Sequence, residues 1–94
     1  MNRLASPAFR DDVQAAQQGV SVYLAKYPTD RMLKSICVQL DYIIEWSEKG
    51  AWPEDPKLDK LNFGLMASHT LEALDPVLAM QLYLLSNEIR KRYE

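Results

Sequence analysis

Proline placement is the sequence feature that most constrains the fold of this chain. The five prolines all stand at the edges of segments with helical periodicity: Pro7, Pro28, Pro53, Pro56 and Pro76. Proline is tolerated in the first turn of a helix but interrupts its interior, and the residue before a proline avoids the helical region. Three of these prolines follow a residue type that caps helices, namely Ser6, Asp55 and Asp75, which is typical of a helix start. The prolines therefore divide the chain into separate helical segments.

Between these breaks, apolar residues recur at three- and four-residue steps, which indicates amphipathic helices. We predict four helices, at about residues 7–26, 30–48, 56–73 and 76–92. No segment alternates between apolar and polar residues as a β-strand would. Short connections place successive helices antiparallel. The expected fold is therefore all-α, a small antiparallel four-helix bundle, in a single domain covering residues 1–94.

Composition and charge narrow the classes of partner. The chain has 94 residues, 48% of them hydrophobic, and a net charge of −2, which fits one folded domain rather than a disordered or nucleic-acid-binding segment. Its one basic cluster, Arg90-Lys91-Arg92, falls at a predicted helix end, where cations complement the helix dipole. No stretch is long and apolar enough for a membrane span or a signal peptide. We expect a cytoplasmic protein that binds neither membrane nor nucleic acid.

Residues that carry chemistry are few and scattered. His69 is the single histidine, and its register with Leu58 and Leu65 predicts a position on or beside the core face. Cys37 is the single cysteine, lies near the predicted core face and has no partner for a disulfide within the chain. The sequence has no cluster of histidine and cysteine residues that would indicate a metal site, and it has no glycine-rich loop that would indicate a phosphate site. We expect no enzymatic activity, no metal and no cofactor. Gly64 separates two apolar patterns, so we expect the third helix to bend there.

The second and fourth predicted helices each carry two apolar stripes. On the second helix, one broad core face includes Leu33 and Leu40, and a separate stripe comprises four residues: Ser35, Gln39, Tyr42 and Trp46. On the fourth helix, a second stripe contains Val77, Met80 and Leu84, with Tyr83 at its flank. A second stripe indicates either a helix packed on both sides or a surface that docks another protein. Docking predicts that Tyr42 and Trp46 are exposed in the free protein.

One segment also resembles a known family. "YLAKYPTDRMLKSICVQLDYI" is similar to a segment of the immunity proteins that neutralise type VI-secreted NAD(P)+ glycohydrolase toxins, on the Tyr27-Pro28 break, the Leu33 position and the Gln39-Leu40-x-Tyr42-Ile43 run. A weaker match is "LDKLNFGLMASHTLEALDPVLAMQLYLLS". The resemblance covers roughly residues 10–85, and it implies a small all-α protein without enzymatic activity. Such a protein binds its cognate toxin domain in the cytoplasm of the producing cell and occludes the NAD-binding active site.

The resemblance gives the second stripe a purpose as a toxin-binding surface. The carboxylates of Asp41, Glu45 and Glu48 edge this stripe and could mimic the charge of the dinucleotide against a basic cleft. We take the toxin-binding candidates to be six residues: Gln39, Asp41, Tyr42, Glu45, Trp46 and Trp52. An alternative remains open, in which the chain is a non-enzymatic helical adaptor, a chaperone-like protein or a homodimerisation module that uses the stripe of the fourth helix. The free immunity protein could likewise form a homodimer.

Overall fold

The computed structural model describes residues 7–49 and 62–91, with side chains described as far as Ile89. Within these residues the chain is helical, with no strand, as predicted. The described helices are α1 (Pro7–Lys26), α2 (Arg31–Lys49), α4 (Phe63–Thr70) and α5 (Pro76–Lys91). The bounds of α1 agree with the prediction and those of α2 differ by one residue at each end. The end predicted for the last helix, Arg92, lies outside the described residues.

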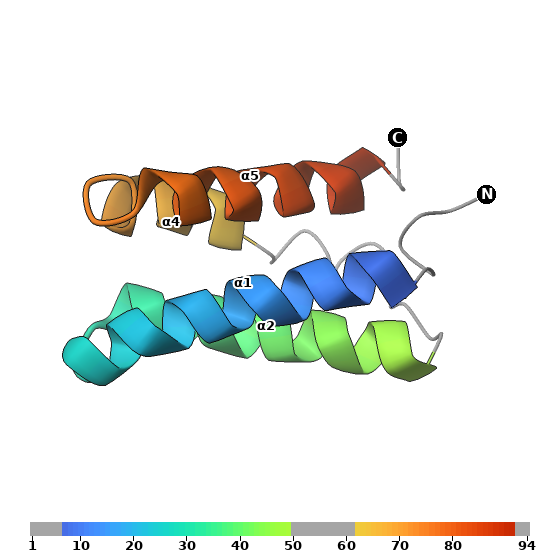
Figure 1. Cartoon of the computed structure of the whole chain (residues 1–94), viewed down its shortest axis with the longest axis horizontal. Coiled ribbons are helices and arrows are strands. Elements are labelled where there is room, and N and C mark those ends of the chain that lie inside the picture. Colours follow the sequence, from blue (N-terminus) through green and yellow to red (C-terminus); the bar gives the residue numbers. More distant parts are fainter. Residues whose placement is uncertain (1–6, 50–61, 92–94) are drawn as a thin grey trace.

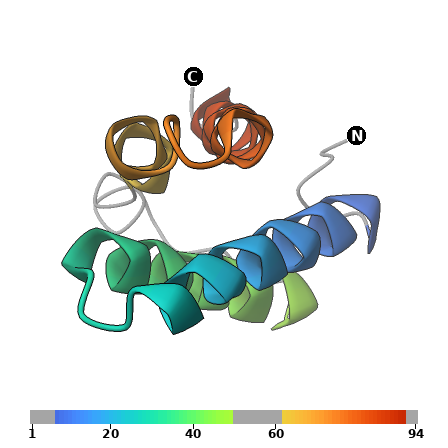
Figure 2. The ribbon, with the colours of Figure 1, turned by 60° about the vertical axis from the view of Figure 1, so that its left-hand side comes forward.

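The four helices form two antiparallel hairpins stacked in two layers. Figure 1 shows α1 and α2 side by side in one layer and the shorter α4 beside α5 in the other. Figure 2 looks almost along α4 and α5, whereas α1 and α2 run obliquely across the view, so the two hairpins cross at an angle. α4 packs on α2, and α5 packs on α1. The predicted small four-helix bundle is therefore confirmed.

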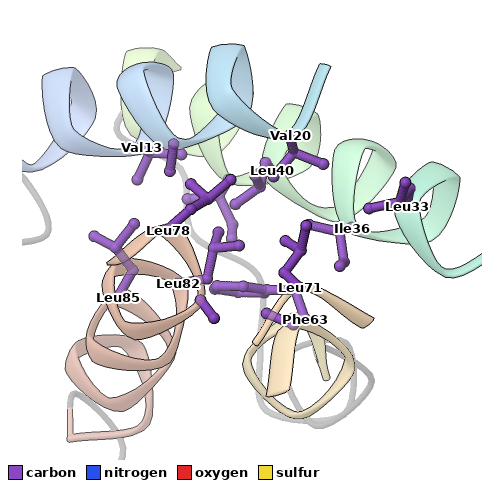
Figure 3. Close-up of a cluster of buried hydrophobic side chains, with 14 of the residues drawn as sticks. Val13, Val20, Leu33, Ile36, Leu40, Phe63, Leu71, Leu78, Leu82 and Leu85 are labelled. Atoms are coloured by element: carbon purple, nitrogen blue, oxygen red, sulfur yellow. The ribbon is translucent and has the colours of Figure 1, made fainter. Parts of the chain in front are cut away.

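The core lies between the layers and receives one apolar face from every helix (Figure 3). α1 and α2 contribute residues at three- and four-residue spacing, as the sequence predicts. The buried hydrophobic residues are Phe9, Val13, Ala16, Val20, Leu33, Ile36, Leu40, Ile43, Phe63, Ala67, Leu71, Leu78, Ala79, Leu82, Leu85 and Ile89. On α5 the buried residues Leu78, Leu82, Leu85 and Ile89 likewise follow each other at three- and four-residue steps.

Aspartate side chains cap the starts of α2 and α5. The Leu33 backbone N–H donates to Asp30 Oδ1 at 3.0 Å, and the Leu78 N–H donates to Asp75 Oδ1 at 3.0 Å. Each carboxylate thereby satisfies an amide that has no partner within its helix, which fixes where the helix starts. The other two predicted caps, Ser6 and Asp55, lie outside the described residues.

The prediction for the third helix was wrong in its extent. The helix was expected over residues 56–73, but α4 begins at Phe63 and ends at Thr70. Asn62 leaves the helical conformation, with φ −127° and ψ 21°, and its backbone N–H donates to the Gln39 side-chain oxygen at 2.8 Å. A side chain of α2 therefore takes the amide that a continuous helix would bond internally. Residues 56–61 lie outside the described residues.

The face of this helix that enters the core was also predicted wrongly. Phe63, Ala67 and Leu71 are buried, whereas Leu65 is 58% exposed. His69 lies on the exposed side, not on or beside the core. Leu65 and His69 do lie on the same face of the helix, as predicted, but that face is exposed. The bulkier Phe63 lies on the other side of the helix, and that side is the one that packs into the core.

Gly64 is needed for close packing of α4 on α5. It is buried, and a Cβ added there would lie 2.7 Å from the Ser86 Cβ, closer than two carbon atoms can approach. The residue lies in the first turn of α4, so it does not bend a longer helix as we expected. Its missing side chain instead allows the two helices of the second hairpin to approach.

Candidate functional site

The predicted second stripe of α2 is divided in the structure. Tyr42 is 51% exposed, but Gln39 is only 9% exposed and lies beneath the start of α4. Trp46 is partly buried and packs against the core. α2 is therefore packed by α1 on one flank and by α4 on the other, with the core between the layers. The packing of α2 on both flanks accounts for much of its wide apolar surface, and Tyr42 is the member of the stripe that faces solvent.

Gln39 uses both ends of its amide to hold the start of α4. Its Nε2 donates to Asn62 Oδ1 at 2.9 Å and to Ser35 Oγ at 3.1 Å, and its Oε1 accepts the Asn62 N–H. Nε2 also lies 3.7 Å from the Met66 sulfur. The side chain is thus satisfied inside the protein, as a buried polar group must be.

Tyr42 and Trp46 form an aromatic pair at the surface of α2. Their ring centroids are 5.9 Å apart and the ring planes are inclined by 15°. Tyr42 meets the expectation of an exposed docking residue, whereas Trp46 meets it only in part. The stacked pair presents a rigid aromatic surface, and the half-exposed Tyr42 adds a hydroxyl group to it. This combination is common at protein interfaces. Trp52 lies outside the described residues.

The acidic residues beside this pair already have partners within the protein. The Gln17 side-chain amide donates to the Asp41 carboxylate, which joins α1 to α2. Lys49 lies 2.7 Å from Glu45, one helical turn away, and this hydrogen bond raises the pKa of the lysine. Both partners of that pair are largely exposed, so the pair contributes little to stability. A bound protein can therefore replace these contacts of Asp41 and Glu45 with contacts from its own cationic side chains, at a small cost in free energy.

A larger apolar surface lies on the second hairpin. We define the α4–α5 surface as five large, exposed side chains: Leu65, Val77, Met80, Tyr83 and Leu84, which are 49–70% exposed. The helix-four stripe predicted from the sequence is thus present and faces solvent. Leu65 was missed as a member because its register was assigned to the core. The sequence signal that could have corrected this is the apolar series Phe63, Ala67 and Leu71 at four-residue steps, which marks the buried face of α4.

Two adjoining hollows follow the seam between α4 and α5. The larger, about 280 Å³, is lined by six residues: Ser68, Glu72, Pro76, Ala79, Met80 and Tyr83. The smaller, about 140 Å³, shares Ser68 and Tyr83 with it and continues past Gly64 and Leu65. A third hollow of about 260 Å³ separates α1 from the other side of α5.

The groups with catalytic potential do not assemble into a cluster. Within residues 7–49 and 62–91, no three histidine, cysteine or acidic side chains are placed to hold a metal ion. His69 is exposed on α4, and Cys37 lies on α2. Partial burial raises the pKa of the Cys37 thiol above 9.0, which keeps it protonated and poorly nucleophilic at neutral pH. In the described part of the chain, no helix is long and apolar enough to cross a membrane.

The described residues form a small helical fold with exposed apolar and aromatic surfaces, a combination typical of proteins that bind other proteins. Comparison with known protein families is specific on this point: the sequence matches the Tsi6 family model over residues 8–91. The chain belongs to the Tsi6 family of type VI secretion immunity proteins, whose partners are cognate toxin proteins. Searches of curated proteins and of solved structures returned no match.

Proposed function

We propose that this protein neutralises a type VI-secreted toxin by binding its catalytic domain and covering the active site, without catalysing a reaction itself. The observation that carries the proposal is the match to the immunity family over residues 8–91, which cover the four described helices except for Pro7. The mode of action fits a protein whose exposed features are apolar and aromatic surfaces rather than a polar cleft. Binding takes place in the cytoplasm of the producing cell, where the toxin would otherwise act.

The toxin that we propose is an NAD(P)+ glycohydrolase. The support is the resemblance of the Tyr27-Pro28 and Gln39-to-Ile43 region to immunity proteins against that class of toxin. A catalytic domain that binds a dinucleotide must hold its pyrophosphate, and cationic side chains are suited to this. An acidic or aromatic surface can occupy such a cleft by matching its charge and its nucleobase-binding face.

We assign the contact on the first hairpin to the exposed side of α2. Tyr42 is its anchor, Trp46 supports the phenol ring by stacking, and Asp41 and Glu45 supply negative charge. Trp52, which follows α2 in the sequence, remains a candidate for toxin binding. Gln39 was a candidate too, but its bonds to Asn62 favour an indirect role, in which it fixes the position of α4 relative to α2.

The test measures toxin binding and toxin inhibition together. The wild-type protein should bind the purified catalytic domain of its cognate toxin and stop its consumption of NAD+. Tyr42→Ala should weaken binding by about thirtyfold, the loss typical of a central aromatic anchor. Its melting temperature should change little, because the side chain is half exposed.

Tyr27→Ala is the matched control, since Tyr27 is 45% exposed but lies in the turn between α1 and α2. It should bind as the wild type does. Equal losses in both variants would contradict a specific role for Tyr42. A wild-type protein that neither binds the toxin domain nor preserves NAD+ would refute the proposed function.

A further inference from the structure

We infer that the α4–α5 surface is a second toxin-contact surface, suited to a partner patch with an apolar centre and a basic rim. This inference rests on the proposed function and adds to it a separate surface on the other hairpin. It concerns Leu65, Val77, Met80, Tyr83 and Leu84 together with the hollows between the two helices.

The apolar content of this surface is not explained by folding. Val77 is 70% exposed, Met80 56% and Leu84 53%, although the opposite side of the same helix supplies the core. On α5 the three residues follow each other at three- and four-residue steps, so they form one continuous ridge. Solvent-facing positions of a helix have no need of such residues for stability. A contiguous exposed ridge of this kind is typical of an interaction site.

The surface also has relief that can hold side chains of a partner. Tyr83 lines both of the adjoining hollows on the seam, so the ridge of α5 is bordered by depressions. The close contact of Gly64 with Ser86 fixes the spacing of α4 and α5 at one end of the seam. The capping bond from the Leu78 N–H to Asp75 fixes the turn at the other end. Such a prearranged surface loses little conformational entropy on binding.

Charge identifies the chemistry of the partner. From Asn62 to Ile89 the sequence contains no lysine or arginine, and Glu72 stands exposed at the wall of the larger hollow. Every lysine and arginine side chain that the structure describes belongs to α1 or α2. The surface is therefore apolar with a negative border, and cations on the partner would complement it.

The same charge distribution disfavours a second copy of this chain on the surface. Two α4–α5 surfaces that face each other would bring Glu72 of both copies to one interface, with no described cation between them. Like charges set against each other at an interface are costly. A toxin domain that binds a dinucleotide carries cationic side chains for the pyrophosphate, and basic residues at the rim of that site, outside the part assigned to α2, have the required chemistry.

The experiment compares three variants for binding to the purified toxin catalytic domain. Met80→Ser removes apolar contact from the ridge, and Glu72→Lys reverses the charge at the hollow. Val22→Ser is the matched control, because Val22 is 64% exposed on α1. We expect Met80→Ser to weaken binding about tenfold or more and Glu72→Lys to slow association, with a smaller dependence on salt than the wild type. Val22→Ser should bind normally, and all three should keep the wild-type melting temperature within a few degrees.

The outcomes separate this inference from the proposed function. If the wild type and all three variants bind the toxin domain equally well, the inference is wrong and the proposed function stands. If the wild type does not bind, the proposed function fails first. Light scattering on the free protein decides the remaining case: a dimer that Met80→Ser dissociates without loss of toxin binding would assign the surface to a second copy and overturn the inference.

Discussion

Gln39 shows how one side chain can determine where a helix begins. Its amide spans α2 and the residue before α4, and it is 9% exposed. A buried amide that lacks a hydrogen-bond partner costs free energy of folding. The Gln39 side chain and Asn62 therefore each depend on the other for their position. The residue was grouped with Tyr42 from its spacing, which gives the direction of a side chain but not what lies opposite. Helical periodicity could not reveal that α4 would cover Gln39 and leave Tyr42 exposed.

Replacement of Gln39 by leucine should destabilise the protein. The Asn62 N–H and the Asn62 side-chain oxygen would both lose their partner, at a cost of about 1–3 kcal/mol. Urea denaturation followed by circular dichroism measures this difference. Gln18→Leu is the control at an exposed glutamine of α1, and it should change the free energy of unfolding by about 0.5 kcal/mol or less. An unfolding midpoint of Gln39→Leu equal to that of the control would contradict the structural role.

Two glycines determine how closely the helices pack, and they differ in what surrounds them. A Cβ at Gly64 would meet the Ser86 Cβ at 2.7 Å, on a helix held against it, whereas a Cβ at Gly19 would meet the end of the Leu78 side chain at 3.1 Å. The first obstacle is tied to the backbone of α5. The second is a methyl group at the far end of a side chain that can rotate.

Gly64→Ala should therefore destabilise the protein by about 1–3 kcal/mol through overpacking. Gly19→Ala should cost less, because the Leu78 methyl group can move aside and the higher helix propensity of alanine, about 1 kcal/mol, then offsets the remaining strain. Thermal unfolding of both variants provides the comparison. If Gly64→Ala were the milder change of the two, the close approach of α4 and α5 would not be a constraint on this fold.

At the scale of the helices, most of the architecture follows from prolines, caps and apolar periodicity. The sequence predicted the bounds of α1 and α2 and the core faces of α1, α2 and α5. Each of these features depends only on residues close together in the chain: a proline, a capping side chain or apolar residues at helical spacing. α4 was not, because its start depends on a contact with Gln39 that lies 23 residues away in the chain. The exposed stripe of α5 was found, but its extension to Leu65 required knowledge of how α4 packs.

At the scale of the whole molecule, a hydrogen bond joins the two hairpins. The Tyr23 hydroxyl on α1 donates to Asp75 Oδ2 at 3.0 Å, while the other oxygen of that carboxylate caps α5. This hydrogen bond raises the pKa of Tyr23 above its ordinary value of 10.0, because an ionised phenol could not donate and would face a carboxylate. One aspartate thus serves a helix start and the contact between layers.

The link predicts a dependence of stability on alkaline pH. Because the pKa of Tyr23 is higher in the folded than in the unfolded protein, its contribution is fully present below pH 10 and is lost as the pH rises through the folded-state pKa. Tyr23→Phe should lower the melting temperature at neutral pH, and the difference from the wild type should shrink above pH 10. Melting curves across this range test the point, with Tyr83→Phe as the control. A difference that stays constant to high pH would exclude the hydrogen bond as its source.

The arrangement as two hairpins has a consequence for how fast the protein becomes active. The helices that pack most extensively are neighbours in the chain, α1 with α2 and α4 with α5, and short turns join each pair. Helical proteins dominated by such local contacts fold on the order of microseconds to milliseconds. For an immunity protein, the interval between synthesis and binding is an interval in which its toxin is unopposed. A chain order that keeps this delay far below the time of translation lets protection begin almost as soon as the polypeptide is complete.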